Sequence, residues 1–348
     1  MSEKRPASRT LGCLAVGLVV ALGGSRARAG AEPHTLRFAT SAPDGTSWAR
    51  TARQFSQEIE DATHGELRIK WYFGGVTGDE RQTLQHIRAR QLDGEAAAGC
   101  SLLSSALRVM NLVGVFRSRE EGIYILRKIR PTIDEEMRQG GFTDLGVTTF
   151  GIDVIFSRTP IRSFADLQRG NFWIWDMAEV AGSLLKSMGI HVQSASLSDA
   201  GRAFESGQID GFVAAPAAAL AFQWTTQAAY FTDLQIDFAP MCLVISSSAM
   251  DKLPLEQQRA LHTVGDRLIK VFEQMGAAQD DALLHKLFEH QGLKRVPVDG
   301  ALRDEFFESA RTARSSLDAT TVPPQLVGRV LDLLADYRAE QRAQGETR

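Results

Sequence analysis

The feature that most constrains the fold is an alternation of short strand-like and helix-like segments, which occurs twice along the chain. Residues 36–99 follow the order strand, helix, strand, helix, strand, and Gly65 ends the first helix. A similar order recurs from residue 145 onward and ends in an expected helix over 217–229. Strands that alternate with helices are typical of largely parallel sheets. The predicted fold class is therefore α/β, with two lobes.

The later part of the chain supplies connections between these lobes. Residues 239–248 are predicted to form a strand that returns toward the first lobe, and the helical pattern from Pro254 to Gly292 has scarcely a break. At about 1.5 Å per residue, such a helix would be roughly 55 Å long. It must therefore lie across both lobes or bend at Gly276. The expected units are residues 30–150 plus about 239–270 for lobe I, 151–238 for lobe II, and 271–348 for C-terminal helices that pack across the lobes, with a hinge near Gly151 and Ala239.

The N-terminus has the three parts of a secretory signal peptide. A basic stretch precedes the uncharged residues 11–24, and Ala27 and Ala29 then form an A-x-A arrangement. The apolar run is shorter than the roughly 18 residues that a membrane span needs. We therefore expect residues 1–29 to be a signal peptide, cleaved near Ala29, and the mature chain to lie in a bacterial periplasm. An uncleaved N-terminal anchor is the alternative.

Charge and cysteine content restrict the partners further. The whole chain has 39 Lys plus Arg and 42 Asp plus Glu residues, of which residues 1–29 hold five and one. The mature chain then has 34 basic and 41 acidic residues, a net charge of −7. Such an acidic surface repels phosphate backbones and argues against nucleic acid as a partner. Cys100 and Cys242 could form a disulfide in this compartment or remain buried free thiols.

No known catalytic, metal or cofactor motif occurs in the sequence. The seven histidines are scattered, and neither H-E-x-x-H, G-x-S-x-G, a P-loop nor G-x-G-x-x-G is present. The glycine-rich segment 74–78 has no following lysine, which favours a tight turn over a phosphate site. We therefore expect neither a metal nor a cofactor, and the pattern favours a binding protein over an enzyme.

Five segments share their order and spacing with a known family. They are LRFAT with the Trp-bearing helix after it, and residues 64–94, 158–168, 205–220 and 243–261. These segments resemble the DctP-type solute-binding proteins of TRAP (tripartite ATP-independent periplasmic) transporters. The resemblance covers nearly the whole mature chain. It implies a two-lobed, type II-like periplasmic binding protein fold with crossing strands and a long bridging helix. It also implies a small-molecule ligand in the inter-lobe cleft and integral-membrane TRAP subunits as partners.

The positions that contact ligand in that family carry different residues here. The family's carboxylate-binding arginine falls at or next to Ile174, and Asp153 stands where many members have a second cation. The family's Gln-Glu-Asn-Pro segment is replaced by residues that include Phe212 and Ala214. The residues that this comparison predicts to line the cleft are Ser41, Trp48, Ala98, Asp153, Trp173, Ile174, Trp175, Leu197, Phe212 and Ala214.

A cleft of this composition is unfavourable for a carboxylate. A buried carboxylate without a partner costs several kcal/mol, whereas an apolar lining rewards burial of apolar ligand surface. The predicted ligand is apolar or amphipathic, and neutral, or cationic if Asp153 faces the cleft. Alternatives are that Trp173 and Trp175 pack as core against a helix and that Asp153 is a surface acid at a strand end. Trp224 is interpreted as a core residue on a helix.

Three classes of function are consistent with these observations. The first is the solute-capture subunit of a TRAP transporter. The second is a signalling or docking module with a degenerate cleft, which works with a membrane sensor or a helical-repeat periplasmic protein. The third is a periplasmic enzyme or lipid chaperone. The absence of catalytic motifs and the match along the chain favour the first.

Overall fold

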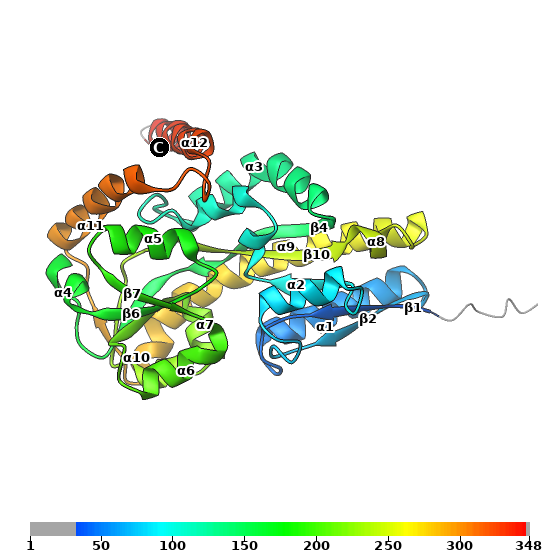
Figure 1. Ribbon diagram of the computed structural model, residues 1–348, viewed down its shortest axis with the longest axis horizontal. Helices are drawn as coiled ribbons and strands as arrows, with labels where there is room; N and C mark the ends of the chain where they lie inside the picture. The colour runs from blue at the N-terminus through cyan, green and yellow to red at the C-terminus, as the bar shows by residue number, and fades with distance from the viewer. Residues whose placement is uncertain (1–32, 346–348) are drawn as a thin grey trace, which may run out of the picture. The chain divides into compact units, whose positions relative to one another are not determined.

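The computed structural model describes residues 33–345, which form two β-sheets and their covering helices (Figure 1). The predicted signal peptide and its cleavage near Ala29 lie outside the described residues. The first sheet has the order β2–β1–β3–β10–β4, formed by Leu67–Tyr72, His34–Ala39, Gly94–Ala97, Phe238–Ser246 and Phe142–Ile152. The second has the order β11–β9–β5–β8–β6–β7, formed by Lys294–Val296, Tyr230–Thr232, Val154–Ser157, Gly211–Ala214, Asn171–Trp175 and His191–Ala195.

Both sheets combine a parallel part with an antiparallel part. In the first sheet β1 is parallel to β2 and β3, and β10 is antiparallel to β3 and β4. In the second sheet β6 is parallel to β7 and β8, and β5 is antiparallel to β8 and β9. The predicted α/β class with two sheets is confirmed.

Several of the helices begin where their sequence supplies a capping side chain. Thr46 caps α1, Asp79 and Ser163 form capping boxes at α2 and α4, and Ser118 and Asp299 cap α3 and α11. The helices are α1 (Ser47–Ala62), α2 (Glu80–Arg88), α3 (Arg119–Gln139), α4 (Phe164–Arg169), α5 (Glu179–Ser187), α6 (Leu197–Glu205), α7 (Pro216–Ala221), α8 (Ser247–Met250), α9 (Leu255–Ala282), α10 (Phe288–His290), α11 (Gly300–Ala313) and α12 (Pro324–Gly345). Shorter helical segments are η1 (Cys100–Leu102), η2 (Ser105–Asn111), η3 (Trp224–Gln227), η4 (Leu283–Leu287) and η5 (Arg314–Ser316).

The chain crosses from one sheet to the other at Asp153 and Asp237. Asp153 separates β4 of the first sheet from β5 of the second, and Asp237 immediately precedes β10. The Asp153 amide donates to the Asp237 carbonyl oxygen at 3.0 Å, and the Ile236 amide donates to the Asp153 carbonyl oxygen at 2.9 Å. Two antiparallel backbone segments therefore join the sheets.

Helix α9 contacts elements that belong to both sheets. It packs on β4 and α1, and on α7 (Figure 1). Val264, Leu268 and Phe272 recur at four-residue intervals and are buried. The helix passes through Gly276 to Ala282 and is followed by the π-helical segment η4. The helical run therefore continues through Gly276 and contacts both parts of the fold, as the first of the two expectations states.

The C-terminal helices also divide between the two parts. Helix α11 packs on α4 and α5, which belong to the second sheet's side, whereas α12 packs on α3 and η2 (Figure 1). Arg338 of α12 forms two hydrogen bonds to the carboxylate of the buried Glu121 on α3, at 2.6 and 2.7 Å. A bidentate pair of this kind fixes the position of α12 on α3.

The helix predicted over residues 217–229 is wrong in its second half. Helix α7 ends at Ala221, because Gln223 has a left-handed backbone with φ of 60°. The short η3 and then strand β9 occupy the rest of the predicted range. Strands β7, β9 and β11 were not predicted. They are three to five residues long and show little alternation, since Val192 is the one buried residue of β7.

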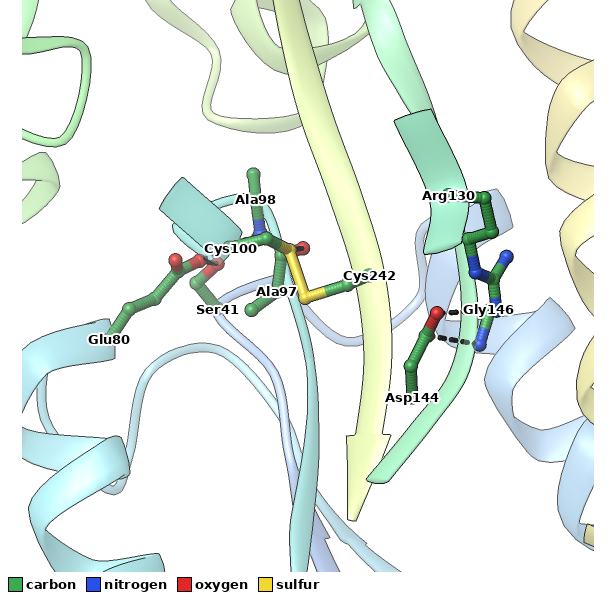
Figure 2. The surroundings of a disulfide bond; sticks show 9 residues. All are labelled: Ser41, Glu80, Ala97, Ala98, Cys100, Arg130, Asp144, Gly146 and Cys242. Atoms are coloured by element: carbon green, nitrogen blue, oxygen red, sulfur yellow. Dashed lines mark hydrogen bonds and ion pairs between the residues drawn. A yellow bond between two sulfur atoms is a disulfide. The ribbon is translucent and has the colours of Figure 1, made fainter. Parts of the chain in front are cut away.

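A disulfide joins Cys100 and Cys242, which settles the choice between a bond and two free thiols (Figure 2). Both cysteines are fully buried. Cys100 begins η1 just after β3, and Cys242 lies in β10, where it pairs in register with Ala97. The bond therefore fixes the end of β3 to the strand that crosses between the sheets.

Replacing both cysteines by alanine should lower the free energy of unfolding by about 3–5 kcal/mol, because the bond closes a loop of 142 residues in the unfolded chain. Urea unfolding of the variant and of the oxidised wild type gives this difference. Reduced, unfolded wild type that is refolded in reductant serves as the control and should match the variant. An unchanged urea midpoint would show that the bond adds no stability.

Candidate ligand-binding site

A cavity of about 110 Å³ lies between the two sheets, and we call it the main cavity. Its walls come from the end of β1 and the following turn, from α1, β3, β6, β8, α7, η3, β10 and α9. The lining residues are Thr40, Ser41, Ala42, Pro43, Thr46, Trp48, Ala52, Ala96, Ala97, Ala98, Asp153, Trp173, Trp175, Leu197, Val213, Ala214, Ala215, Ala218, Ala221, Phe222, Trp224, Ala239, Met241 and Phe272. Apolar side chains dominate this lining, as in most small-molecule sites.

Aromatic rings that pack on one another form much of the wall. The Trp48 ring of α1 stacks on Phe272 of α9 with centroids 4.9 Å apart. Trp173 meets Trp224 edge to face at 4.9 Å, and Phe222 stacks on Trp224 at 5.1 Å. These contacts hold the rings in fixed orientations. The aromatic part of the cavity is therefore preformed.

The structure brings eight of the ten predicted cleft residues together around the main cavity. They are Ser41, Trp48, Ala98, Asp153, Trp173, Trp175, Leu197 and Ala214. Trp173 and Trp175 share one side of β6, as their alternation predicts. Trp173 is only 1% exposed and belongs to a core cluster. It therefore lines the main cavity and is at the same time part of the core.

Two of the predicted residues do not line the main cavity. Ile174 lies between the two tryptophans on the opposite side of β6, where it packs toward Gly182 of α5. Phe212 is 1% exposed and stacks on Phe156 of the neighbouring strand with centroids 4.8 Å apart. Ile174 points away from the main cavity because side chains alternate along β6. Phe212 is kept from the main cavity by the aromatic rings that pack on it, Phe156 among them.

Several residues that line the main cavity were not predicted from the sequence. Trp224 was assigned to the core alone, yet it lines the main cavity as well. Phe272 and Met241 come from α9 and β10, far along the chain from α1 and β3, whose residues they face across the main cavity. Phe272 shares the buried stripe of α9, so nothing in its local pattern separates it from core residues. The stacking partner Trp48 becomes visible only in three dimensions.

Asp153 is the one charged residue among those that line the main cavity in the described part of the chain. It is 8% exposed and lies in the crossing segment rather than at a surface strand end, so the surface interpretation is wrong. No Lys, Arg or His is among the lining residues of the described chain. The described wall thus offers a ligand one carboxyl group and no positive charge.

Two buried acids, Glu80 and Glu95, lie beside the alanines of β3, and Figure 2 shows Glu80 next to Ser41 and Ala98. Glu80 accepts hydrogen bonds from the Ser41 hydroxyl at 3.3 Å and the Ala98 amide at 3.2 Å. Burial raises the pKa of Glu80 to about 7, against the opposing effect of these hydrogen bonds. Burial also raises the pKa of Glu95 well above its ordinary value, with the nearby Glu80 adding to the shift.

The described residues contain no group of three or more His, Cys, Asp and Glu side chains arranged to hold a metal ion. Over residues 33–345, no helix combines the length and the apolar character that a bilayer crossing requires.

Two α/β sheets joined by crossing strands, with an apolar cavity between them, define a two-lobed binding protein. Residues 38–316 match the model of the DctP family, described as bacterial extracellular solute-binding protein, family 7. The match spans most of the chain, and the chain belongs to this family. The resemblance predicted from the sequence is confirmed, and the chain is a solute-binding protein.

Solved structures of similar fold include the sugar acid binding protein DctPAm from Advenella mimigardefordensis in complex with galactonate. Its TM-score is 0.81 at 16% sequence identity, and the match covers 88% of this chain and 99% of that one. DctP7 from Bordetella pertussis, a receptor that binds pyroglutamic acid, has a TM-score of 0.77 at 18% identity, with 86% and 99% covered. At sequence identities below 20%, these similarities establish that this chain has the same fold.

A curated relative is the uncharacterized protein YiiZ from Salmonella typhimurium. It is 24% identical over 212 residues. The match covers 58% of this chain and 63% of the relative, so the chain matches less than two thirds of that protein's length.

The raised pKa of Glu80 predicts a specific dependence of stability on pH. Between pH 4.5, the ordinary pKa of glutamate, and about 7, the folded state keeps a proton that the unfolded state has released. The free energy of unfolding should therefore fall as pH rises through this window. Glu80→Gln should reduce this fall and make the protein more stable than wild type at pH 7.5, by about 1–3 kcal/mol.

Urea unfolding at pH 5 and pH 7.5 measures both effects. Glu95 contributes in the same direction, so the variant removes only part of the slope. The exposed Glu256→Gln is a matched control and should leave the pH profile unchanged. Equal pH profiles for Glu80→Gln and wild type would contradict the prediction.

Proposed function

We propose that this protein is the solute-capture subunit of a TRAP transporter and that it binds a small apolar or amphipathic molecule that lacks a carboxylate. The ligand occupies the main cavity between the two sheets. After export to the periplasm, the loaded protein delivers the ligand to integral-membrane transporter subunits. The protein binds its ligand and catalyses no reaction.

The observation that carries this proposal is the absence of a cationic side chain from the residues that line the main cavity in the described chain. DctPAm binds galactonate and DctP7 binds pyroglutamic acid, and both of these ligands are acids. In this chain a ligand carboxylate would face Asp153 and no lysine or arginine. Burial of a carboxylate without a partner costs several kcal/mol, so a different ligand class fits the site.

The size and the walls of the main cavity support a compact apolar ligand. An apolar cavity of about 150 Å³ is known to hold a benzene-sized molecule, and the main cavity has about 110 Å³. Trp48, Trp175 and Phe272 present ring faces or edges to this space. Burial of apolar ligand surface contributes roughly 25 cal/mol for each Å². A single ring or a short branched chain matches these dimensions.

The competing proposals are a docking module and a lipid chaperone or enzyme. A docking module with a degenerate cleft would act with a membrane sensor or a helical-repeat periplasmic partner, and the formed cavity argues against it. A cavity of this volume is too small for a lipid chain, which argues against the chaperone. Native mass spectrometry, described next, distinguishes these proposals from solute capture.

Native mass spectrometry of the mature protein, purified from a bacterial periplasm, tests the proposed function. We expect a bound molecule in one-to-one amount that is apolar or amphipathic and carries no carboxylate. A co-purified carboxylic acid would contradict the proposed ligand class while keeping the receptor function. An empty protein that co-purifies with another polypeptide would instead support the docking module.

Filling the main cavity should weaken ligand binding without unfolding the protein. Ala218 lies on α7, is half-buried and lines the main cavity. Ala218→Leu places three more carbon atoms in this space, and we expect the affinity for the co-purified molecule to fall roughly tenfold or more. Isothermal titration calorimetry measures the affinity. Ala301→Leu on the exposed face of α11 is the control and should bind as wild type does.

A further inference from the structure

A second, smaller cavity adjoins the main cavity, and we call it the annex. It has a volume of about 30 Å³ and shares five lining residues with the main cavity, namely Ala98, Asp153, Trp175, Val213 and Ala239. Its remaining lining residues are Ser101, Asn111, Ile174, Met177, Ala178 and Pro240. The annex therefore extends the apolar site toward a group of polar side chains at the crossing between the sheets.

The polar groups of the annex present hydrogen-bond acceptors. The Asn111 amide nitrogen donates to the Asp237 carboxylate at 2.8 Å and to the Phe238 carbonyl oxygen at 3.1 Å. Since both amide hydrogens are used, Asn111 offers its carbonyl oxygen to the annex. The Ser101 hydroxyl donates to the Met177 carbonyl oxygen at 3.4 Å, which leaves its oxygen lone pairs as acceptors.

Asp153 provides the third group of acceptors. A carboxyl group keeps acceptor lone pairs in either protonation state, so Asp153 can accept from a ligand in addition to its other contacts. Asp153, Asn111 and Ser101 are all buried, with exposed fractions of 8%, 5% and 6%. Three acceptors that converge on a volume of about 30 Å³ match a small head group with three hydrogens to donate.

The charge around the annex favours a cation. Within the described chain, no Lys, Arg or His lines the annex or the main cavity. Asp237 accepts a hydrogen bond from Asn111, and its carboxyl group also shares a hydrogen bond with the carboxyl group of Asp153. Burial raises the pKa of Asp237 to about 6. A hydrogen bond between two carboxyl groups needs a proton on one of them, so this pair presents one negative charge. Arg119 of α3 is also buried and donates to the Thr149 hydroxyl at 3.2 Å among its contacts, and it lines neither cavity.

We propose that the annex binds the primary ammonium group of the ligand, whose apolar body fills the main cavity. The substrate class is thus a small apolar primary amine. This inference rests on the proposed function of the main cavity and specifies the head group that the site selects. An ammonium group donates three hydrogens and carries the charge that the hydrogen-bonded pair of Asp153 and Asp237 complements.

Three probes of nearly equal size test the head group. Benzylamine is protonated at neutral pH, benzyl alcohol is its neutral analogue, and benzoate is its carboxylate analogue. Isothermal titration calorimetry at pH 7.5, with ligand-free protein, should rank the affinities as benzylamine, then benzyl alcohol, then benzoate. We expect a preference for the amine over the alcohol of roughly ten- to hundredfold, as charge-assisted hydrogen bonds provide.

Variants at the annex connect this preference to named residues. Asp153→Asn should remove most of the preference for benzylamine and leave the affinity for benzyl alcohol nearly unchanged. Ser101→Val should also reduce the preference, because it occupies the annex and removes an acceptor. Asp176→Asn removes the same charge from a residue that lines neither cavity, and it should behave as wild type. Circular dichroism verifies that each variant is folded.

The outcomes separate the two proposals. Equal binding of the amine and the alcohol would overturn the ammonium site and keep the apolar cavity. Tightest binding of benzoate would overturn both. Failure of benzylamine to bind at millimolar concentration, or an unchanged preference in folded Asp153→Asn and Ser101→Val proteins, would overturn the ammonium site.

Discussion

The antiparallel ladder between β4 and β10 is the interaction on which the rest of the structure depends. Its register runs from the pair Phe238 and Ile152 to the pair Ser246 and Phe142. At one end of this ladder both strands pass into the second sheet through Asp153 and Asp237, and on its other side β10 pairs with β3. The ladder, its neighbour β3 and the Cys100–Cys242 bond form a continuous frame. The floor of the main cavity, with Ala239 and Met241, belongs to this frame.

Much of the fold could be predicted from the sequence, because its strand and helix patterns agree with their final packing. The helix through Gly276 and the strand that carries Trp173 and Trp175 are examples. The strands β7, β9 and β11 could not be predicted, since they bury too few side chains to alternate and depend on neighbouring strands for their hydrogen bonds.

The cavity-lining residues could be predicted where they lie together on a single strand or turn. Alternation along β6 separates Ile174 from its neighbours, and the resemblance to a family could not fix that register by itself. Phe212 differs, because it lies on the same side of β8 as Ala214 and pairs in register with Trp173, yet the Phe156 and Trp224 rings pack against it, and no sequence pattern shows that packing. Phe272 reaches the wall from a helix more than two hundred residues beyond Trp48, and only tertiary packing brings them together.

Ten of the residues that line the main cavity are alanines, contributed by the turn after β1, by α1, β3, β8, α7 and β10. An alanine wall ends at Cβ, so almost any substitution there adds atoms and shrinks the space, whereas very few can enlarge it. Selection acting on this wall can therefore shift the receptor readily toward smaller solutes. A shift toward larger solutes would require loss of Trp48, Trp175 or another packed ring, at a cost in stability. The present wall thus sets an upper bound on solute size that mutation lowers more easily than it raises.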